Sequence, residues 1–85
     1  MAIWRIDTCK TEAGYKSHAS IYNLIREGLW TQPVRLGARS VGWPEAEVTA
    51  ICAVRIAGKS DDEIRALVVQ LQERRLKALE TLVSS

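Results

Sequence analysis

Residues 16–43, KSHASIYNLIREGLWTQPVRLGARSVGW, decide the fold of this chain. Ile21, Leu24 and Ile25 are apolar residues at helical spacing, and the stretch ends in two short apolar runs joined by a turn. This pattern predicts a helix followed by a β-hairpin. The side chains outside the apolar pattern are mostly polar or positively charged, which suits a surface that contacts DNA.

A short helix is expected before this stretch. It should begin near Thr8, with Asp7 or Thr8 itself as the cap, and Gly14 should close it because glycine tolerates the left-handed conformation at helix ends. Ser17 is the expected N-cap of the next helix, which should end at Gly28. Two helices joined by a short turn that contains glycine are typical of a helix-turn-helix.

The two apolar runs after this helix predict strands whose side chains alternate between two faces. Val34 and Leu36 should lie on one face of the first strand and Arg35 on the other, and Gly37 supplies the turn. In the return strand we expect Val41 and Trp43 to face inward, and Ser40 and Gly42 to face outward. The exposed parts of the hairpin therefore form a basic wing beside the helix.

Two further helices are expected after the hairpin. Pro44 should open the first of them, with Glu47 in the first turn where the helix dipole favours an acid, and Gly58 should end it. Residues 60–63 form a capping-box pattern for a last helix that runs to about residue 82. The expected buried stripe of the first helix is Val48, Ile51, Cys52 and Val54.

The last helix carries two apolar stripes. One consists of Ile64, Leu67, Val68 and Leu71, continued by Ala78 and Leu82. The other consists of Val69, Leu76, Leu79 and Val83, roughly 100° away at ~3.6 residues per turn. A domain this small can hardly cover both, so the second stripe is interpreted as a dimer or partner contact; the alternative is a frayed end or residues scattered on the surface. Arg74, Arg75 and Lys77 are interpreted as a solvated face.

Length and composition bound the class of protein. Eighty-five residues can bury one modest core, which predicts a mainly α fold with a small β-hairpin wing. Residues 1–58 should form a winged helix-turn-helix domain, with residues 3–6 as an extended lead-in, and residues 59–85 a C-terminal helix that packs on it, dimerises, or does both. The chain has neither an apolar run near ~20 residues nor a signal peptide, so we expect a cytoplasmic protein in which Cys9 and Cys52 are buried thiols rather than a bridge.

The charge is distributed unevenly along the chain. Residues 1–43 hold six Lys and Arg against three Asp and Glu, a balance of +3, whereas residues 44–85 hold six against seven, a balance of −1. The net charge of +2 is a weak argument for a nucleic-acid partner, but the positive excess belongs to the half that carries the helix and the hairpin.

These residues resemble the AlpA-type regulators of phages and prophages, small winged-helix proteins related in fold to MerR-type DNA-binding domains and to excisionases. The matching features are Gly14-Tyr15-Lys16-Ser17 in the turn, Ser20-Ile21-Tyr22 on the second helix, Gly28 at its end, and residues 33–43 in the wing. The match continues through Pro44, Glu47 and Val48, then through Ile56-Ala57-Gly58 and Asp61, Glu63, Ile64 and Arg65. The chain has Trp30-Thr31 where the family usually has Phe-Pro, and its C-terminal helix is longer. The resemblance implies control of mobile-element genes, typically integrase or excision genes, or direct help to an integrase during excision.

A DNA-reading helix projects its N-terminal half and one polar face into the major groove. We expect His18 and Asn23 to contact base edges, and Tyr22 and Arg26 to contact phosphates or stack on bases. Residues 16–17 and the helix N-terminus should hold a phosphate, because free amides and the helix dipole favour an anion there. The wing arginines would reach the flanking backbone or the minor groove. The predicted DNA-binding residues are Lys16, Ser17, His18, Ser20, Tyr22, Asn23, Arg26, Arg35, Arg39 and Ser40.

Several of these residues also have a purely structural interpretation. Tyr22 would be a half-buried core residue, Arg26 would pair with a surface carboxylate, and His18 would be an ordinary exposed polar residue. A metal role for His18 is disfavoured, because no Cys or His stands at ligand spacing from it. Trp30 and Trp43 are interpreted as core residues rather than as base-stacking platforms.

The resulting hypothesis is a sequence-specific DNA-binding regulator of a phage or mobile genetic element. It would act at the bacterial nucleoid on double-stranded DNA, as a dimer or as side-by-side monomers, with integrase or RNA polymerase as further partners. No enzymatic activity, cofactor or metal is expected, since the chain has one histidine, no Cys-His spacing and no Gly-rich phosphate loop. Two alternatives stay open: an excision factor that bends DNA and contacts integrase, and an adaptor that binds proteins through its C-terminal helix.

Overall fold

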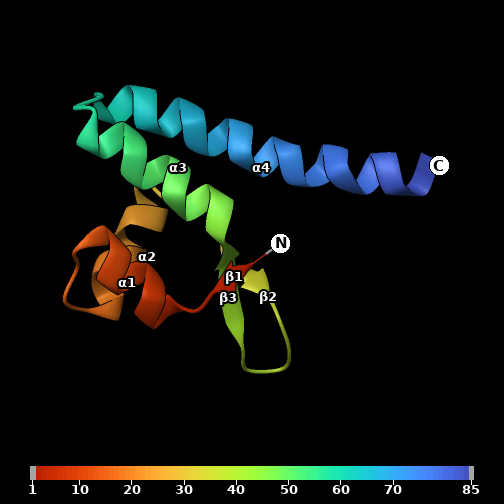
Figure 1. Cartoon of the computed structure of the whole chain (residues 1–85), viewed down its shortest axis with the longest axis horizontal. Helices are drawn as coiled ribbons and strands as arrows, with labels where there is room; N and C mark the ends of the chain where they lie inside the picture. The colour runs from red at the N-terminus through yellow and green to blue at the C-terminus, as the bar shows by residue number, and fades with distance from the viewer. Residues whose placement is uncertain (1, 85) are drawn as a thin grey trace.

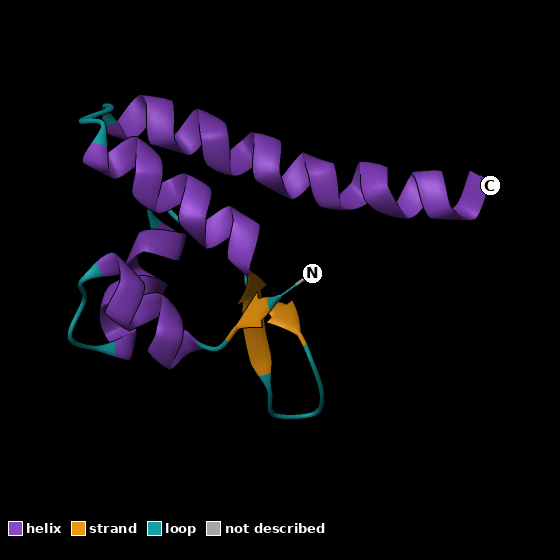
Figure 2. Ribbon diagram, viewed as in Figure 1, coloured by secondary structure: helices purple, strands orange, loops and turns teal. Residues whose placement is uncertain are grey.

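The computed structural model describes the backbone of residues 2–84 and the side chains of residues 2–78. It is mainly helical, with a small three-stranded sheet in the order β1-β3-β2 (Figure 1, Figure 2). The elements in chain order are β1 (Ile3–Trp4), α1 (Ile6–Ala13), α2 (His18–Arg26), β2 (Val34–Arg35), β3 (Val41–Pro44), α3 (Glu45–Ile56) and α4 (Asp61–Ser84). Residues 34–43 form the wing. The predicted fold class, mainly α with a hairpin wing and a long C-terminal helix, is confirmed.

Helix α1 begins earlier than predicted. Its N-cap is Arg5, which makes no side-chain capping bond, so the predicted caps Asp7 and Thr8 are wrong and lie inside the helix. The reason is β1, which ends at Trp4 and leaves Arg5 in extended backbone with ψ of 165°, from which the helix turns directly. The other end of α1 follows the prediction, because Gly14 adopts a left-handed φ of 79°.

The caps of α2 and α4 follow the sequence pattern. The Ser17 hydroxyl accepts the backbone N–H three residues later at 3.4 Å. Gly28, the predicted stop of α2, adopts φ of 78° two residues after the last helical residue. At the start of α4, the Ser60 hydroxyl accepts the N–H of Glu63 at 3.3 Å and donates to the Glu63 carboxylate at 3.2 Å.

Pro44 belongs to the sheet, which corrects the prediction that it is the first residue of α3. It ends β3, pairs with Ile3 of β1, and has an extended ψ of 131°. The N–H of Glu45 donates to the carbonyl of Ala2 at 2.9 Å, so the pairing of β1 with β3 continues into the first residue of α3. Because this ladder keeps Pro44 extended, the helix starts one residue later.

Gly42 is buried, although the alternation along the hairpin predicted that it faces outward. The register of β2 and β3 sets Val34 opposite Gly42, so both lie on the same face of the sheet. A Cβ added at Gly42 would come within 2.7 Å of Ile3 Cγ2 and 3.1 Å of Leu36 Cδ1. Strand β1 pairs with the other edge of β3, and the side chain of its Ile3 covers Gly42 on this face.

The core lies between the sheet and all four helices. Its buried apolar residues are Cys9, Ile21, Leu29, Trp30, Trp43, Val48, Ile51, Ile64, Val68 and Leu71. The first stripe of α4 packs as predicted up to Leu71, whereas Ala78 is exposed and Leu82 lies outside the described side chains. Beyond the core, α4 continues past the rest of the molecule (Figure 1). Cys9 and Cys52 are free thiols, as predicted.

Candidate nucleic-acid interface

The tip of the wing points away from α4, whereas the C-terminal end of α2 contacts α4. Helix α3 packs beneath α4, and α1, α2 and the sheet lie beyond α3 (Figure 1). None of the ten predicted DNA-binding residues is buried, and all are exposed except the half-buried Ser20 and Ser40. We call this set the basic face: Lys16, Ser17, His18, Ser20, Tyr22, Asn23, Arg26, Arg35, Arg39 and Ser40.

His18 ties the first two helices together. Its Nε2 lies 2.9 Å from Oδ1 of Asp7 at the start of α1. This hydrogen bond is the main cause that lowers the pKa of Asp7. Desolvation opposes it, and Lys10, whose Nζ lies 3.6 Å from the same oxygen, adds a weaker lowering effect. The Nδ1 atom of His18 has no hydrogen-bond partner among the described residues. His18 is therefore held in place by one ring nitrogen and offers the other to solvent.

Asn23 and Arg26 contact each other on the exposed side of α2. The Arg26 Nη2 donates to Oδ1 of Asn23 at 2.8 Å, and both residues are exposed. The alternative that Arg26 pairs with a carboxylate is not found among the described residues. The amide nitrogen of Asn23 and the remaining guanidinium donors of Arg26 stay available to a ligand.

Tyr22 connects α2 with the wing. Its ring meets the ring of Trp43 on β3 edge-on, with centroids 6.4 Å apart and planes at 64°. Tyr22 is 42% exposed, so its structural interpretation as a half-buried residue and its role on the surface are compatible. Trp43 and Trp30 are 0% and 1% exposed, which confirms that they belong to the core.

Cations of the basic face lack the acidic partners that several other cations of the chain have, such as Lys10 with Asp7. Within the part that the structure describes, Lys16, Arg35 and Arg39 have no carboxylate within 4.0 Å. In contrast, three cations of the C-terminal half are paired with carboxylates of the same half, although Arg55 and Arg74 of that half have no carboxylate within 4.0 Å among the described residues. These pairs are Lys59 with Glu63, Arg65 with Asp62, and Arg75 with Glu47. Apart from His18, which contacts Asp7, the positively charged side chains of the basic face are therefore not neutralised by acids among the described residues.

Arg5 is an exposed cation that the sequence analysis did not select. It lies between β1 and α1, and it makes no ion pair among the described residues. The signal in the sequence is its position between Trp4 and Ile6, whose side chains pack against the core. A charged residue between two anchored apolar neighbours must point its side chain elsewhere.

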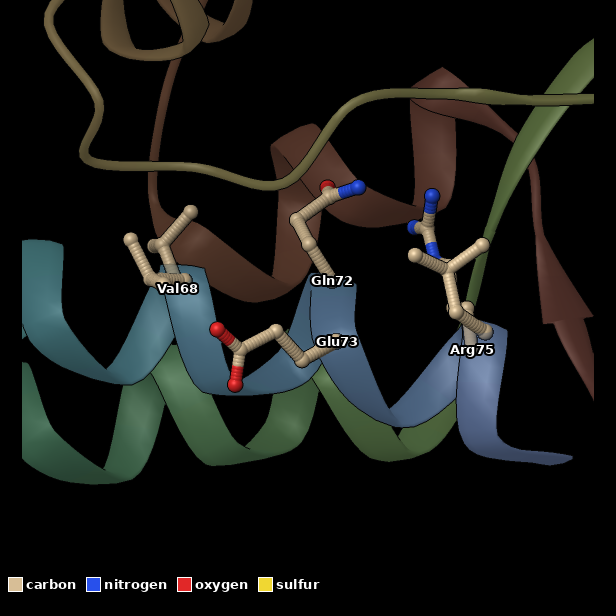
Figure 3. Close-up of a pocket in the computed structure, with 6 residues that line it drawn as sticks. Val68, Gln72, Glu73 and Arg75 are labelled. Atoms are coloured by element: carbon tan, nitrogen blue, oxygen red, sulfur yellow. The ribbon is translucent and has the colours of Figure 1, made fainter.

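Arg75 is not part of a solvated face, which corrects its interpretation from the sequence. Its guanidinium binds both carboxylate oxygens of Glu47, with Nε 2.7 Å from Oε2. Glu47 is 6% exposed, so this acid is a buried partner of α4 rather than only a favourable charge in the first turn of α3. Figure 3 shows Arg75 and Gln72 projecting from α4 toward the loop between α2 and β2.

Helix α4 also holds the end of α2. The Arg65 Nε donates to the backbone carbonyl of Glu27 at 2.8 Å, and the aliphatic part of Arg65 covers Gly28, with Cγ 3.6 Å from where a Cβ would stand. The carbonyls at a helix C-terminus lack partners within the helix. Arg65 supplies such a partner to the carbonyl of Glu27, the C-cap residue of α2.

The described residues provide little that favours other kinds of site. Among their side chains, no group of three or more His, Cys, Asp or Glu residues is placed to hold a metal ion. None of the helices formed by residues 2–84 combines the length and the hydrophobicity of a membrane span.

Two comparisons with known proteins give matches. The curated protein "Uncharacterized protein ORF88" of Enterobacteria phage P4 is 49% identical over 43 residues. The match covers 51% of this chain and 49% of that protein, so the chain spans about half the length of this relative. No solved structure matches. The family model described as "Prophage CP4-57 regulatory protein (AlpA)" matches residues 10–55, which include α2, the wing and most of α3. This match covers more than half of the chain and confirms the resemblance, and the protein belongs to the AlpA family of prophage regulatory proteins.

Proposed function

We propose that this protein is a sequence-specific DNA-binding regulator of a phage or mobile genetic element, and that it controls transcription of integrase or excision genes. It acts in the bacterial cytoplasm, at the nucleoid. The observation that carries the proposal is the uncompensated positive charge of the basic face, which lies on α2 and the wing of a regulator family. Phosphates supply the missing negative charge, because most of the affinity of such proteins comes from contacts to the backbone of DNA.

The residues of α2 have distinct roles in this proposal. Ser17 and the N-terminus of α2 bind a phosphate, because the first N–H groups of a helix and its dipole favour an anion. Asn23 reads a base edge, and Arg26 positions the Asn23 amide through their 2.8 Å hydrogen bond until DNA competes for both. His18 contacts DNA through Nδ1 while Asp7 holds the ring.

The wing residues anchor the complex beside the groove that α2 reads. Arg35 and Arg39 are exposed and unpaired among the described residues, so they bind phosphates or enter the minor groove without first breaking an ion pair. Such contacts fix the position of the protein on DNA but carry little information on sequence.

The first test is binding to duplexes selected from a randomised pool. We expect the protein to bind a selected duplex at least about 10³-fold more tightly than a scrambled duplex of equal length. The logarithm of the binding constant should fall linearly with the logarithm of salt concentration, because phosphate contacts release counterions. Absence of any duplex selected above background, or affinity that does not change with salt, would contradict the proposal.

Two variants separate base reading from phosphate binding. Asn23→Ala should lose about 1–3 kcal/mol of discrimination between selected and scrambled duplex. Arg39→Ala should weaken binding to both duplexes alike and reduce the salt slope by about one. Arg74→Ala is the matched control, because Arg74 is an exposed arginine of α4 that is not one of the proposed DNA-binding residues, and it should leave the slope unchanged. If Asn23→Ala and Arg39→Ala behaved the same, the assigned roles would be wrong.

We also propose that two copies pair through the second stripe of α4 when they occupy DNA. Val69 and Leu76 are 57% and 63% exposed and line a shallow hollow of about 370 Å³ together with Gln72 and Glu73 (Figure 3). Leu79 and Val83, the other members of the predicted stripe, lie outside the described side chains. Integrase and RNA polymerase are the proposed partners of the DNA-bound form.

A further inference from the structure

The segment that leads into the wing has no regular secondary structure, yet side chains hold its backbone. We call residues 31–33 the wing lead. The N–H of Gln32 donates to Oε1 of Gln72 on α4 at 2.7 Å. The carbonyl of the same residue accepts from Nη2 of Arg75 at 2.9 Å. Both backbone polar groups of Gln32 are therefore bound by α4, although a surface loop usually leaves such groups to water.

The neighbouring residue of the wing lead is held from the other side. The indole N–H of the buried Trp43 on β3 donates to the carbonyl of Thr31 at 2.8 Å, and Thr31 itself is 0% exposed. Three hydrogen bonds from side chains thus bind the backbone groups of Thr31 and Gln32. The wing lead is fixed between β3 and α4 at the point where the chain leaves the core for the wing.

The contact with Glu47 orients the Arg75 side chain for its hydrogen bond to the wing lead. Its bidentate contact with Glu47 fixes the plane of the guanidinium, because the fork of Arg matches the two oxygens of a carboxylate. The same Nη2 atom serves Glu47 and the carbonyl of Gln32. Buried ion pairs contribute little net stability, so fixing a geometry is the effect that this pair contributes most clearly.

The wing itself has few bonds that would fix its position. Strand β2 consists of Val34 and Arg35, which pair with β3, and beyond them the N–H groups of Leu36 and Gly37 donate to the carbonyl of Ser40 at 2.8 and 3.3 Å. Residues 36–39 at the tip are exposed. A two-stranded ribbon is marginal by itself, so its position depends on what holds its base. On the β3 side the base is held by the pairing with β1 and by the buried Trp43, and on the β2 side it is held by the wing lead.

We propose that Gln72 and Arg75 are positioning residues for DNA binding. By holding the backbone of Gln32 they fix the wing, and with it Arg39, relative to α2. Figure 3 shows the two side chains directed toward the same loop and Glu73 directed away from it. This inference rests on the proposed function, because it assigns to α4 the alignment of two parts that contact one DNA molecule.

The test uses Gln72 rather than Arg75, since removal of Arg75 would leave Glu47 buried without its partner and threaten folding. Gln72→Ala removes the acceptor of the Gln32 N–H. Gln72→Glu keeps a side-chain oxygen at that position and should rescue the contact. Gln70→Ala is the matched control, because Gln70 is an exposed glutamine of the same helix with no hydrogen-bond partner among the described residues.

The first readout is amide hydrogen exchange in the protein without DNA. We expect the Gln32 amide to exchange about 3- to 10-fold faster in Gln72→Ala, as for the loss of one hydrogen bond, while amides of the core keep their rates. In Gln72→Glu and Gln70→Ala the rate should stay within about twofold of the wild type. An unchanged Gln32 rate in Gln72→Ala would overturn the proposal.

The second readout is the salt slope on the selected duplex. Gln72→Ala should reduce the slope by about one, as Arg39→Ala does, although it removes no charge. The double variant should reduce it no further, because the contact of Arg39 is already lost. If Arg39→Ala lowered the salt slope in the Gln72→Ala protein as much as it does in the wild type, the proposal would be overturned. If the wild type does not bind DNA, the proposed function fails, and the exchange of the Gln32 amide still decides whether α4 holds the wing lead.

Discussion

Cys9 is a thiol that the fold keeps away from water. Its side chain is 0% exposed, and its Sγ lies 3.9 Å from the carbonyl oxygen of Trp4. Burial raises the pKa of this thiol to about 11, and the nearby thiol of Cys52 adds to the rise. Burial also raises the pKa of Cys52, which is half-buried. Both groups are therefore protonated and poorly nucleophilic at neutral pH, because the thiolate is the reactive form.

Alkylation measures this protection. At about pH 8, iodoacetamide should modify Cys9 only after urea has unfolded the chain, whereas the half-buried Cys52 should react measurably in the folded protein. Peptide mass spectrometry identifies the modified residue. Modification of Cys9 at the same rate with and without urea would contradict its burial.

The same thiol gives a pH dependence of stability with a defined sign. The folded protein retains the Cys9 proton up to about pH 11, whereas the unfolded chain loses it above its ordinary pKa of 9.0. The contribution to stability is therefore complete below pH 9 and falls as the pH rises toward 11. We expect the urea midpoint to fall more steeply over this range in the wild type than in Cys9→Ala, which has no thiol proton to lose there.

Single residues were predictable when their role depends on neighbours in the sequence. Ser17 and Gly14 cap helices because of the residues beside them, and the structure confirms both. Glu47 and Arg75 lie 28 residues apart, and their pairing was not predictable. Arg75 follows Leu71 by one helical turn and so continues the buried stripe, but no local pattern indicates which acid would meet it.

At the scale of elements, the close approach of β1 to β3 depends on Gly42. Its missing Cβ leaves room for Ile3, and the backbone carbonyl of Trp4 would lie 3.0 Å from such an atom. The hairpin alone predicted an outward residue here, because a single hairpin does not show that a third strand will pair with β3 and place the Ile3 side chain over Gly42. The pairing partner of β1 is set by the whole core, and the alternation of residues 3–6 does not specify it.

Gly42→Ala should therefore separate β1 from β3 or distort their pairing. We expect the free energy of unfolding to fall by about 1–3 kcal/mol, as for other overpacked sites. Gly37→Ala is the control, since nothing lies within 4 Å of an added Cβ at Gly37. Urea denaturation followed by circular dichroism compares the stability of the two variants. Equal stability would show that the Ile3 side chain can move away from the added Cβ without a measurable loss of free energy.

At the scale of the whole molecule, α4 serves two faces. Its inner side completes the core and holds the wing lead, while Val69 and Leu76 on another side remain exposed. An exposed apolar stripe on a helix that extends past the molecule favours contact with a second copy. The periodicity of α4 predicted both stripes, but it could not predict the polar contacts to the loop, because these depend on the path of a distant segment.

Leu76→Glu tests the pairing of two copies. Sedimentation of the wild type on its selected duplex should show two paired copies, and the variant should bind the duplex as single copies under the same conditions, because a buried unpaired charge is costly. Gln70→Glu adds the same charge to an exposed residue outside the stripe and should leave the association unchanged. A wild type that is monomeric both alone and on its selected duplex would contradict the proposal.

The exposure of the basic face followed from the sequence, whereas its internal contacts did not. The polar positions of α2 opposite Ile21 and Leu24 had to face solvent once those residues packed inward. The bonds of His18 to Asp7 and of Arg26 to Asn23 depend on side-chain rotamers and on the placement of α1. The pattern of a helix therefore predicts which residues are offered to DNA, and the tertiary structure determines how each is oriented.

Arg65 and Gln72 stand seven residues apart on α4, so they project from the same side of the helix about 10 Å apart along its axis. Arg65 binds the carbonyl of Glu27 at the end of α2, and Gln72 binds the backbone N–H of Gln32 in the wing lead. The length of helix between Arg65 and Gln72 sets the distance and the angle between these two contacts. Each residue added or removed between them would rotate one contact relative to the other by about 100° around the helix axis. The separation of the two proposed DNA-reading parts is therefore a property of the pitch of α4.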